Sequence, residues 1–293
     1  MKTKIAVIIV TFNRLALLKE CIESVRKQTY QNYDIIVINN GSTDNTSQWL
    51  SAQADIIIIN QENSGGAGGF YTGLKYSCEH GYSYSWIMDD DVIADANALY
   101  ALMDKRLLTK GFLCSRVFDS NGELCNVPKL SIVKSSLSNE YVWGNYLDNR
   151  MLRVDVASFV SVLIDNRVVY EIGLPYRDYF IWGDDTEYTS RISSKYASFM
   201  VIDSFVTHKR KIQTILSIFS EKDKKRYRNF YFLYRNRIHL QHCIWMKIIY
   251  WLYAWYHVVL LLLKGQFIKS GIILKAALNS LFFHPSISFP EQK

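Results

Sequence analysis

The sequence predicts an α/β fold in which a mostly parallel β-sheet carries helices on both faces. Apolar runs rich in Ile and Val alternate four times with helix-like segments in the first 110 residues, a pattern typical of successive strand–helix units. The expected strands are the runs 4–10, 33–38, 55–59 and 84–88. The expected helices are the segments 15–25, 44–52, 70–79 and 95–108.

The first expected helix has an apolar face and a candidate N-terminal cap. Leu15, Leu18 and Ile22 recur at the spacing of one helix face, and Asn13 is a candidate cap ahead of them. The middle of the chain is less regular, and the short strands expected there are 112–118, 152–164 and 199–206.

A shift in composition near residues 210–225 predicts the domain organisation. From about residue 224 the chain becomes helical, aromatic and basic, and then strongly apolar. We therefore expect an α/β domain over 1–220 and a helical region over 221–293. Within the first domain we expect two halves, 1–110 and 111–220.

Composition excludes several classes of protein. The 293 residues are 49% hydrophobic and 21% charged, with four prolines and a mean hydropathy of −0.02. These values exclude a disordered, a collagen-like and a polytopic membrane protein. The five scattered cysteines include no C-x-x-C pair, and only six apolar residues follow Met1–Lys4. We therefore expect a reduced, cytosolic chain without a structural zinc site or a signal peptide.

Positive charge is concentrated in one stretch, residues 205–237. This stretch holds ten basic and two acidic residues, whereas the rest of the chain holds 24 basic and 25 acidic residues. Anionic lipid and nucleic acid are both partners that such a stretch would suit, and a solvated helix face is the simpler alternative.

Three loops follow expected strands at the edge of the sheet where ligands of α/β folds bind: Thr11–Arg14, Asn39–Asp44 and Asp89–Asp91. The three adjacent carboxylates of Asp89–Asp91 repel one another unless a cation lies between them. Oxygen ligands of this kind suit Mg²⁺ or Mn²⁺. A helix N-terminal cap is the alternative, but one Asp would serve that purpose.

A glycine-rich run precedes the third expected helix. It reads N-S-G-G-A-G-G-F over residues 63–70, so the backbone amides of Gly65 and Gly66 could face a phosphate or a sugar. The run matches neither the dinucleotide fingerprint nor the P-loop, and a flexible turn is an equally good interpretation.

A second acidic cluster lies at 182–187, W-G-D-D-T-E. If this segment is helical, Asp184 and Glu187 share a face and Asp185 points elsewhere. A carboxylate among aromatic residues is partly desolvated, which raises its pKa and suits a general base. A helix cap is the alternative. His208, beside the basic run, is on spacing alone more typical of a structural histidine than of a metal ligand.

Four motifs in order closely resemble the family 2 inverting glycosyltransferases of the GT-A fold. They are V-I-I-V-T-F-N-R, V-I-N-N-G-S-T-D-N-T, W-I-M-D-D-D and F-I-W-G-D-D-T-E-Y. G-G-A-G-G-F before the D-D-D resembles the bacterial galactofuranosyltransferase and rhamnosyltransferase branch. The resemblance covers roughly residues 4–237 and implies a nucleotide-binding half, 1–110, and an acceptor half, 111–220.

The resemblance implies a role for individual residues. The residues implied in nucleotide-sugar binding are Thr11, Phe12, Asn13, Arg14, Asn39, Gly65, Gly66 and Asp90, with Asn39 standing where many relatives have an Asp. The implied ligands of Mn²⁺ or Mg²⁺ are Asp89, Asp91 and His208. Asp185 would be the catalytic base, and the implied acceptor-side residues are Trp143, Trp182 and Asp184.

The implied activity is metal-dependent transfer of a sugar from a nucleotide diphosphate with inversion. The donors expected are galactofuranose first, then rhamnose, then a pyranose hexose, on UDP or dTDP. The acceptor would be a glycan or a lipid-linked glycan in cell-surface polysaccharide synthesis. A processive polysaccharide synthase and a non-catalytic nucleotide-binding or membrane-scaffold protein are the alternatives, although the chain carries no Q-x-x-R-W motif. The T-F-N-R that follows the first strand disfavours a nicotinamide oxidoreductase.

The C-terminal region predicts a membrane surface as partner rather than nucleic acid. Residues 248–263 are nearly all apolar and rich in Trp and Tyr, but Lys247 and Lys264 bracket only sixteen residues, fewer than the ~20 that a span needs. The stretch 272–283 is also short. We therefore expect helices that lie in the cytoplasmic leaflet of the cell membrane. The alternatives are a transmembrane anchor and a buried core helix or homo-oligomer contact.

Overall fold

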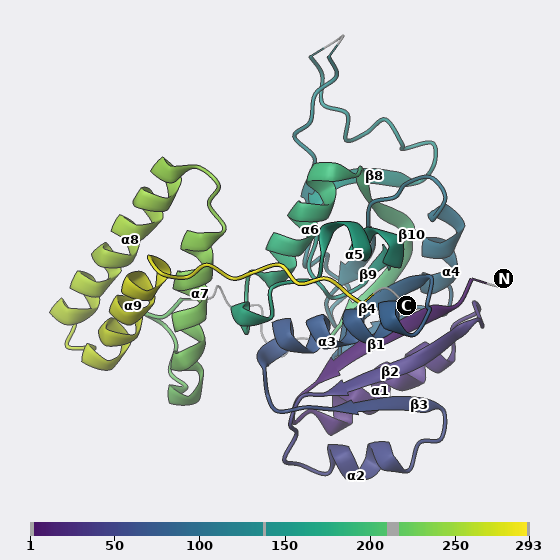
Figure 1. Cartoon of the computed structure of the whole chain (residues 1–293), viewed down its shortest axis with the longest axis horizontal. Coiled ribbons are helices and arrows are strands. Elements are labelled where there is room, and N and C mark those ends of the chain that lie inside the picture. The colour runs from purple at the N-terminus through teal and green to yellow at the C-terminus, as the bar shows by residue number, and fades with distance from the viewer. Residues whose placement is uncertain (1–2, 137–138, 210–216, 292–293) are drawn as a thin grey trace. The chain divides into compact units, whose positions relative to one another are not determined.

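The computed structural model describes residues 3–136, 139–209 and 217–291, which form two compact units (Figure 1). The first unit comprises 1–177, 185–211 and 287–293, and the second comprises 178–184 and 212–286. The functional division predicted at residue 220 stays a prediction.

The first unit is a ten-stranded sheet with helices on both faces. Its strands are β1 (Ile5–Thr11), β2 (Tyr33–Asn39), β3 (Ile56–Asn60), β4 (Tyr84–Asp89), β5 (Val92–Ala94), β6 (Leu113–Phe118), β7 (Lys129–Leu130), β8 (Met151–Val156), β9 (Val162–Asp165) and β10 (Ser198–His208). Its helices are α1 (Leu15–Arg26), α2 (Thr46–Ser51), α3 (Gly65–Glu79), α4 (Ala98–Lys105), α5 (Asn166–Ile172) and α6 (Asp184–Lys195), whose first residue belongs to the second unit.

The sheet order is β3-β2-β1-β4-β9-β6-β10-β8-β7, with β5 paired to β10. The expected parallel pairing holds for β3, β2, β1 and β4, whereas in the other half β6–β10 is the parallel pair and the remaining pairs are antiparallel. The predicted strand 152–164 is two strands, because β8 pairs with β10 while β9 lies between β4 and β6. The α/β fold is confirmed, with a mixed rather than mostly parallel sheet.

Alternation along β1 builds a core on each face of the sheet. Ile5, Val7 and Ile9 join the core that contains α1 residues, and Ala6, Ile8 and Val10 join the core that contains α3 residues. Because all six are buried, β1 is covered on both faces, as a strand in the middle of an α/β sheet must be.

The glycine-rich run is not a turn before a helix, as predicted, but the first turns of α3 itself. A Cβ on Gly69 would lie 2.3 Å from Cγ1 of Val10, and one on Gly73 would lie 2.3 Å from Cγ2 of Ile8. The missing side chains therefore let α3 pack directly against β1.

The second unit contains three α-helices among its described residues: α7 (Tyr227–His239), α8 (Ile244–Leu263) and α9 (Phe267–Ser280), with a 3₁₀ turn η2 (Lys224–Arg226) before α7. Their shared core includes Phe230 of α7, Val258 of α8 and Ile273 of α9. The segment 178–184 joins this unit because the side-chain amide of Asn236 donates to its backbone.

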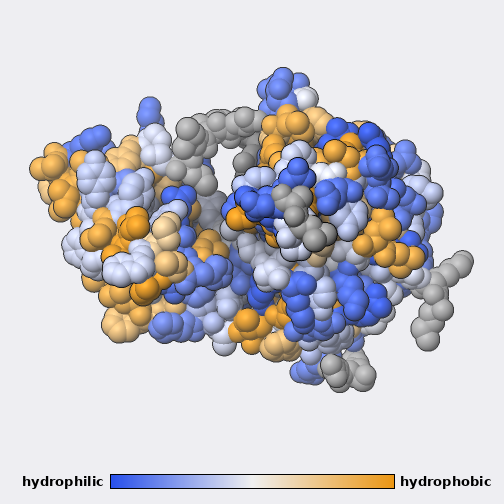
Figure 2. All heavy atoms as spheres, turned by 90° about the horizontal axis from the view of Figure 1, so that it is seen from above, coloured by the Kyte–Doolittle hydropathy of each residue, from blue (hydrophilic) through white to orange (hydrophobic). Residues whose placement is uncertain are grey.

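Helix α8 corrects the expected length of the apolar segment. It begins at Ile244 and includes Lys247 in its first turn, so it has 20 residues. Among the described residues, it is the one helix long and apolar enough to cross a membrane, by length and composition only. The length of α8 therefore does not argue against a membrane span, whereas the sixteen residues between Lys247 and Lys264 did. Figure 2 shows hydrophobic side chains gathered on the surface of the helical unit.

Candidate active site

Three predicted loops meet at one edge of the sheet, as expected. The strands that precede them lie side by side in parallel, with Thr11 in register with Asn39 and Val10 in register with Asp89. The loops Thr11–Arg14, Asn39–Asp44 and Asp89–Asp91 therefore leave the sheet together at the carboxyl ends of their strands.

Asp89, Asp91 and His208 come together at this edge. One potential ligand atom from each residue lies within 4.8 Å of the others. The pairing of β5 with β10 places His208 opposite Val92, next to Asp91 in the chain. Asp91 and His208 are buried, with 6% and 3% of their surface exposed.

The hydrogen bonds of His208 fit a metal ligand. Its Nδ1 lies 3.0 Å from Oδ1 of Asn126, and its Nε2 lies 3.0 Å from Oδ1 of Asp91. Nε2 thus lies within ion-pair distance of the Asp91 carboxylate. When Nδ1 donates to Asn126, the lone pair of Nε2 would be available to a divalent ion, for which an imidazole nitrogen and two carboxylates are a suitable set of ligands. The role of the three residues as metal ligands stays a prediction.

Arg14 is a cation that contacts the carboxylates of this edge. Its Nη1 lies 3.2 Å from Oδ1 of Asp90 and 3.0 Å from Oδ2 of Asp91. Burial, only partly offset by Arg14 and a hydrogen bond from Thr11 Oγ1, raises the pKa of Asp90 to about 6. Burial would also raise the pKa of Asp91, but His208 and Arg14 outweigh it and hold that pKa below its usual value.

Asn13 joins two of the loops and is not a helix cap. The cap position of α1 is Arg14, which makes no side-chain capping bond. Oδ1 of Asn13 instead accepts the backbone amides of Thr43 at 2.7 Å and Asp44 at 3.3 Å, with Asn13 in the left-handed region at φ 55°. The prediction of a cap was therefore wrong, and the residue fixes the loop after β1 to the loop after β2.

The other residues implied in nucleotide binding differ in accessibility. Phe12 is 41% exposed, and a Cβ on Gly66 would meet open space. The amide of Gly65 is not bare, because it donates to Oδ1 of Asn63. Asn39 is buried, and its Nδ2 donates to Ser47 Oγ and Asn60 Oδ1. Its implied contact with the base or ribose stays a prediction.

The predicted acidic cluster lies at the start of α6. Oδ1 of Asp185 accepts the backbone amide of Thr186 at 2.6 Å, while Glu187 pairs with Arg191 at 2.9 Å and Asp184 is buried. Glu187 is thus committed to an ion pair, and Asp185 is the more accessible of the two aspartates. This arrangement suits the implied assignment of the base to Asp185, which stays a prediction.

The two implied acceptor-side tryptophans lie in different units. Trp143 is 36% exposed in the segment between β7 and β8, in the first unit. Trp182 belongs to the second unit, where its ring packs edge-on against Phe230 at 5.5 Å between centroids. The basic residues Arg210 and Lys211 lie outside the described residues.

Sequence reasoning missed two asparagines near these residues. Asn126 orients His208, and Asn236 holds the backbone of the segment that leads into α6. Neither lies in a motif or a periodic segment, so the sequence carried no signal for them.

Comparison with known proteins places the chain among the glycosyltransferases of family 2. A family model described as Glycosyl transferase family 2 matches residues 6–153. The glycosyltransferase GlyG of Streptococcus pneumoniae serotype 4 (strain ATCC BAA-334 / TIGR4) is 34% identical over 106 residues, which is 35% of this chain and 35% of that protein. The chain thus spans about a third of the length of this curated relative.

Solved structures share the fold at low identity. The crystal structure of S. aureus TarS 1–349 in complex with UDP matches with a TM-score of 0.54 and 16% identity, over 80% of this chain and 64% of that one. GalNAc-T7 with UDP, GalNAc and Mn²⁺ matches with a TM-score of 0.56 and 13% identity, over 80% of this chain and 48% of that one. This likeness confirms the expected GT-A fold.

Proposed function

We propose that this chain, which belongs to glycosyl transferase family 2, is a glycosyltransferase that transfers a sugar from a UDP-sugar, with inversion and with the help of a divalent metal, to a lipid-linked glycan at the membrane. The observation that carries this proposal is the convergence of Asp89, Asp91 and His208 at the carboxyl edge of the sheet, beside Arg14.

Each residue of the edge has a defined task in this proposal. Asp89, Asp91 and Nε2 of His208 would hold Mn²⁺ or Mg²⁺, and the bound ion would supply Lewis-acid stabilisation of the negative charge on the nucleotide diphosphate. Arg14 is long enough to turn from the carboxylates to the same phosphates, and its side chain is half exposed. Asp185 takes the proton of the acceptor hydroxyl as that oxygen attacks the anomeric carbon from the face opposite the diphosphate.

Two observations support the choice of donor. TarS and GalNAc-T7 were each solved with UDP, and GalNAc-T7 also with Mn²⁺. The G-G-A-G-G-F of α3 resembles the galactofuranosyltransferase and rhamnosyltransferase branch, so galactofuranose is the favoured sugar and rhamnose, on dTDP, the next.

A donor screen tests this assignment. The purified protein is incubated with UDP-galactofuranose, dTDP-rhamnose and common UDP-hexoses, with Mn²⁺ and a lipid-linked acceptor, and the products are detected by mass. We expect nucleotide release that depends on acceptor and metal. Products with many added sugars would instead favour a processive synthase, and no turnover with any donor would count against catalysis as assigned.

Asp185→Asn tests the base within the same assay. Loss of the base should lower turnover by at least ~100-fold while donor binding persists, because the metal ligands are unchanged. Glu187→Gln is the matched control, since Glu187 is tied to Arg191. Equal losses in both variants, or none in Asp185→Asn, would move the base elsewhere.

The surface of α8 supports the proposed attachment to the cytoplasmic face of the membrane. Large apolar side chains on this helix are exposed, among them Trp245 at 71%, Ile249 at 55% and Leu252 at 55%. The three recur at helical spacing, so they form one apolar face of the kind that inserts at the headgroup boundary. Attachment here would bring the enzyme to a lipid-linked acceptor.

Vesicle binding by the full-length protein tests the attachment. Replacing Trp245, Ile249 and Leu252 together by Gln should release the protein from membranes. Leu107→Gln, at a residue 77% exposed in the first unit, should not. Wild-type protein that stays soluble in the presence of membranes would refute attachment.

A further inference from the structure

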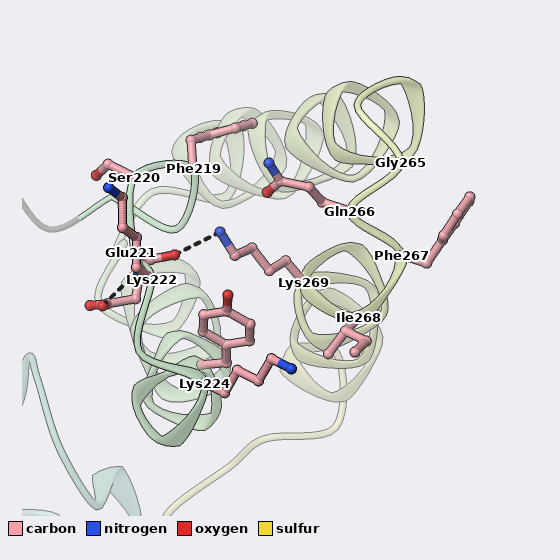
Figure 3. Close-up of a pocket in the computed structure, with 11 residues that line it drawn as sticks. Phe219, Ser220, Glu221, Lys222, Lys224, Gly265, Gln266, Phe267, Ile268 and Lys269 are labelled. Carbon is pink, nitrogen blue, oxygen red and sulfur yellow. Dashed lines mark hydrogen bonds between the residues drawn. The ribbon is translucent and has the colours of Figure 1, made fainter.

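The second unit contains a groove that the transfer reaction does not use. A pocket of about 700 Å³ lies at the start of α9, and a neighbouring pocket of about 640 Å³ shares Lys224, Tyr227 and Ile268 with it. We call the two together the α9 groove. Figure 3 shows Lys269 and Gln266 extending their side chains from the start of α9 into the first pocket.

Positive charge lines the groove. Its cationic side chains are Lys222, Lys224, Arg228, Lys269 and Lys275. Among the described residues that line it, the one carboxylate is Glu221, which already pairs with Arg226 at 3.2 Å. Charge complementarity therefore points to an anionic ligand.

Lys269 is the buried centre of this charge. It is 7% exposed, its Nζ donates to the backbone oxygen of Glu221 at 2.8 Å, and its ammonium lies 4.9 Å from the ring centre of Tyr227. An ammonium group has three N–H donors, and the described residues supply one hydrogen-bond acceptor. A buried cation left in this state is costly unless an anion completes its contacts.

Gln266 of the same pocket has a buried hydrogen-bond acceptor that lacks a donor. Its Oε1 is buried and has no hydrogen-bond partner among the described residues. A buried acceptor without a donor is costly, so a ligand that brings a hydroxyl group would restore the missing bond.

The first turn of α9 adds further donors. Gln266 is its N-cap and makes no side-chain capping bond, so this side chain leaves the first amides of the 14-residue helix uncapped. Helix N-termini of this kind favour phosphate, because their amides and dipole both point at the ligand.

The mouth of the groove is apolar. Phe267 and Ile268 are each 69% exposed although they line the first pocket. A ligand that satisfies both the charged interior and this rim has an anionic head and an apolar chain.

We propose that the α9 groove binds the headgroup of an anionic glycerophospholipid whose head carries a hydroxyl, as phosphatidylglycerol does. The phosphate accepts hydrogen bonds from Lys269 and the first amides of α9, and the hydroxyl donates to Oε1 of Gln266. Phe267 and Ile268 enter the acyl region. This site rests on the membrane attachment proposed above and gives that attachment a lipid preference.

Vesicle flotation of the full-length protein tests the site. Vesicles contain phosphatidylcholine alone or with an equal mole fraction of phosphatidylglycerol or phosphatidylserine, so the last two match in net charge. Wild-type protein should bind the phosphatidylglycerol vesicles several-fold more tightly than the phosphatidylserine vesicles.

Two variants locate this preference in the groove. Lys269→Met should weaken binding to phosphatidylglycerol about tenfold, the scale of a charge-assisted hydrogen bond. Gln266→Leu, which changes no charge, should abolish the preference for phosphatidylglycerol over phosphatidylserine. Lys110→Met, at an exposed lysine of the first unit, is the charge-matched control and should change binding about twofold or less.

The outcomes separate the site from the attachment. Equal binding to both anionic vesicles, with Lys269→Met no weaker than the control, overturns the site and leaves attachment intact. Failure of the wild type to bind any vesicle overturns both. If Lys269→Met does not fold, judged by circular dichroism, Gln266→Leu and Lys224→Met at an exposed lysine of the groove decide the question.

Discussion

Replacing Asn236 with alanine should loosen the segment that leads into the candidate catalytic helix. Asn236 is 1% exposed, and its Nδ2 lies 2.9 Å from the backbone oxygen of Tyr179, 3.2 Å from that of Ile181 and 2.9 Å from that of Trp182. Its Oδ1 accepts from the guanidinium of Arg235. One side chain therefore holds a segment in which Phe180, Trp182 and Gly183 have positive φ.

The expected magnitude follows from these contacts. Each hydrogen bond contributes about 0.5–1.5 kcal/mol net, and a charged donor such as Arg235 about 1.5–3 kcal/mol. Arg235 keeps a bond to the carbonyl of Asp178, so only part of its contribution is lost. We therefore expect Asn236→Ala to lower the free energy of opening of this segment by about 3 kcal/mol, which is a roughly hundredfold rise in its open population.

Hydrogen exchange measures this directly. Amides of 178–183 should exchange about a hundredfold faster in Asn236→Ala, and kcat should fall while KM for the donor is unchanged, because Asp185 follows this segment. Asn279→Ala is the matched control, since Asn279 makes an exposed hydrogen bond to Tyr231.

Asn236→Asp tests whether the N–H donors of Asn236, and not the shape of its side chain, hold the segment. It preserves the shape and the acceptor for Arg235 but turns an oxygen toward the three carbonyls, so it should be at least as harmful as alanine. The reasoning is refuted if Asn236→Asp behaves as wild type, or if Asn236→Ala is no worse than Asn279→Ala.

Three further predictions concern other parts of the chain. Asn126→Ala should weaken Mn²⁺ binding about 10–100-fold in a calorimetric titration, because the ring of His208 loses its orienting bond. Gly73→Ala should lower the free energy of unfolding by about 1–3 kcal/mol in urea, whereas Gly66→Ala, with open space at its Cβ, should not. Burial lowers the pKa of His239 from 6.5 to about 4, so as the pH falls the unfolded chain binds this proton before the folded chain does. The free energy of unfolding should therefore fall by about 1–3 kcal/mol as the pH drops from 6.5 to about 4. Thermal melts across this pH range check the last prediction, and His239→Gln should flatten the dependence.

The sequence was most informative where structure is local. The strands around β1 and the loops after them follow from apolar runs and from the rule that parallel strands share a carboxyl edge. The antiparallel half did not follow, because the pairing of β8 with β10 joins segments far apart in the chain and periodicity carries no information about such partners.

The candidate site also contains residues that the local sequence predicts and residues that only the strand pairing brings together. Asp89–Asp91 stands out as a run of carboxylates, whereas His208 reaches it only through the register of β5 and β10, and spacing alone made His208 look structural. The resemblance to a family supplied what local physics could not. The expected helix 70–79 lies within α3, but the glycine-rich first turns of α3 were missed because glycine is a poor helix former and packing against β1 overrides that preference.

The two units are interleaved along the chain, and this has a consequence for synthesis. Ser288 returns to the first unit, where its carbonyl accepts the amide of Leu174 and its hydroxyl contacts Tyr71. A nascent chain must therefore release most of the helical unit from the ribosome before the sheet can make these contacts. Likewise, residues 178–183 emerge long before Asn236 and wait for their hydrogen bonds. We expect the α/β unit to remain incomplete, and exposed to chaperones and proteases, until translation has passed Ser288.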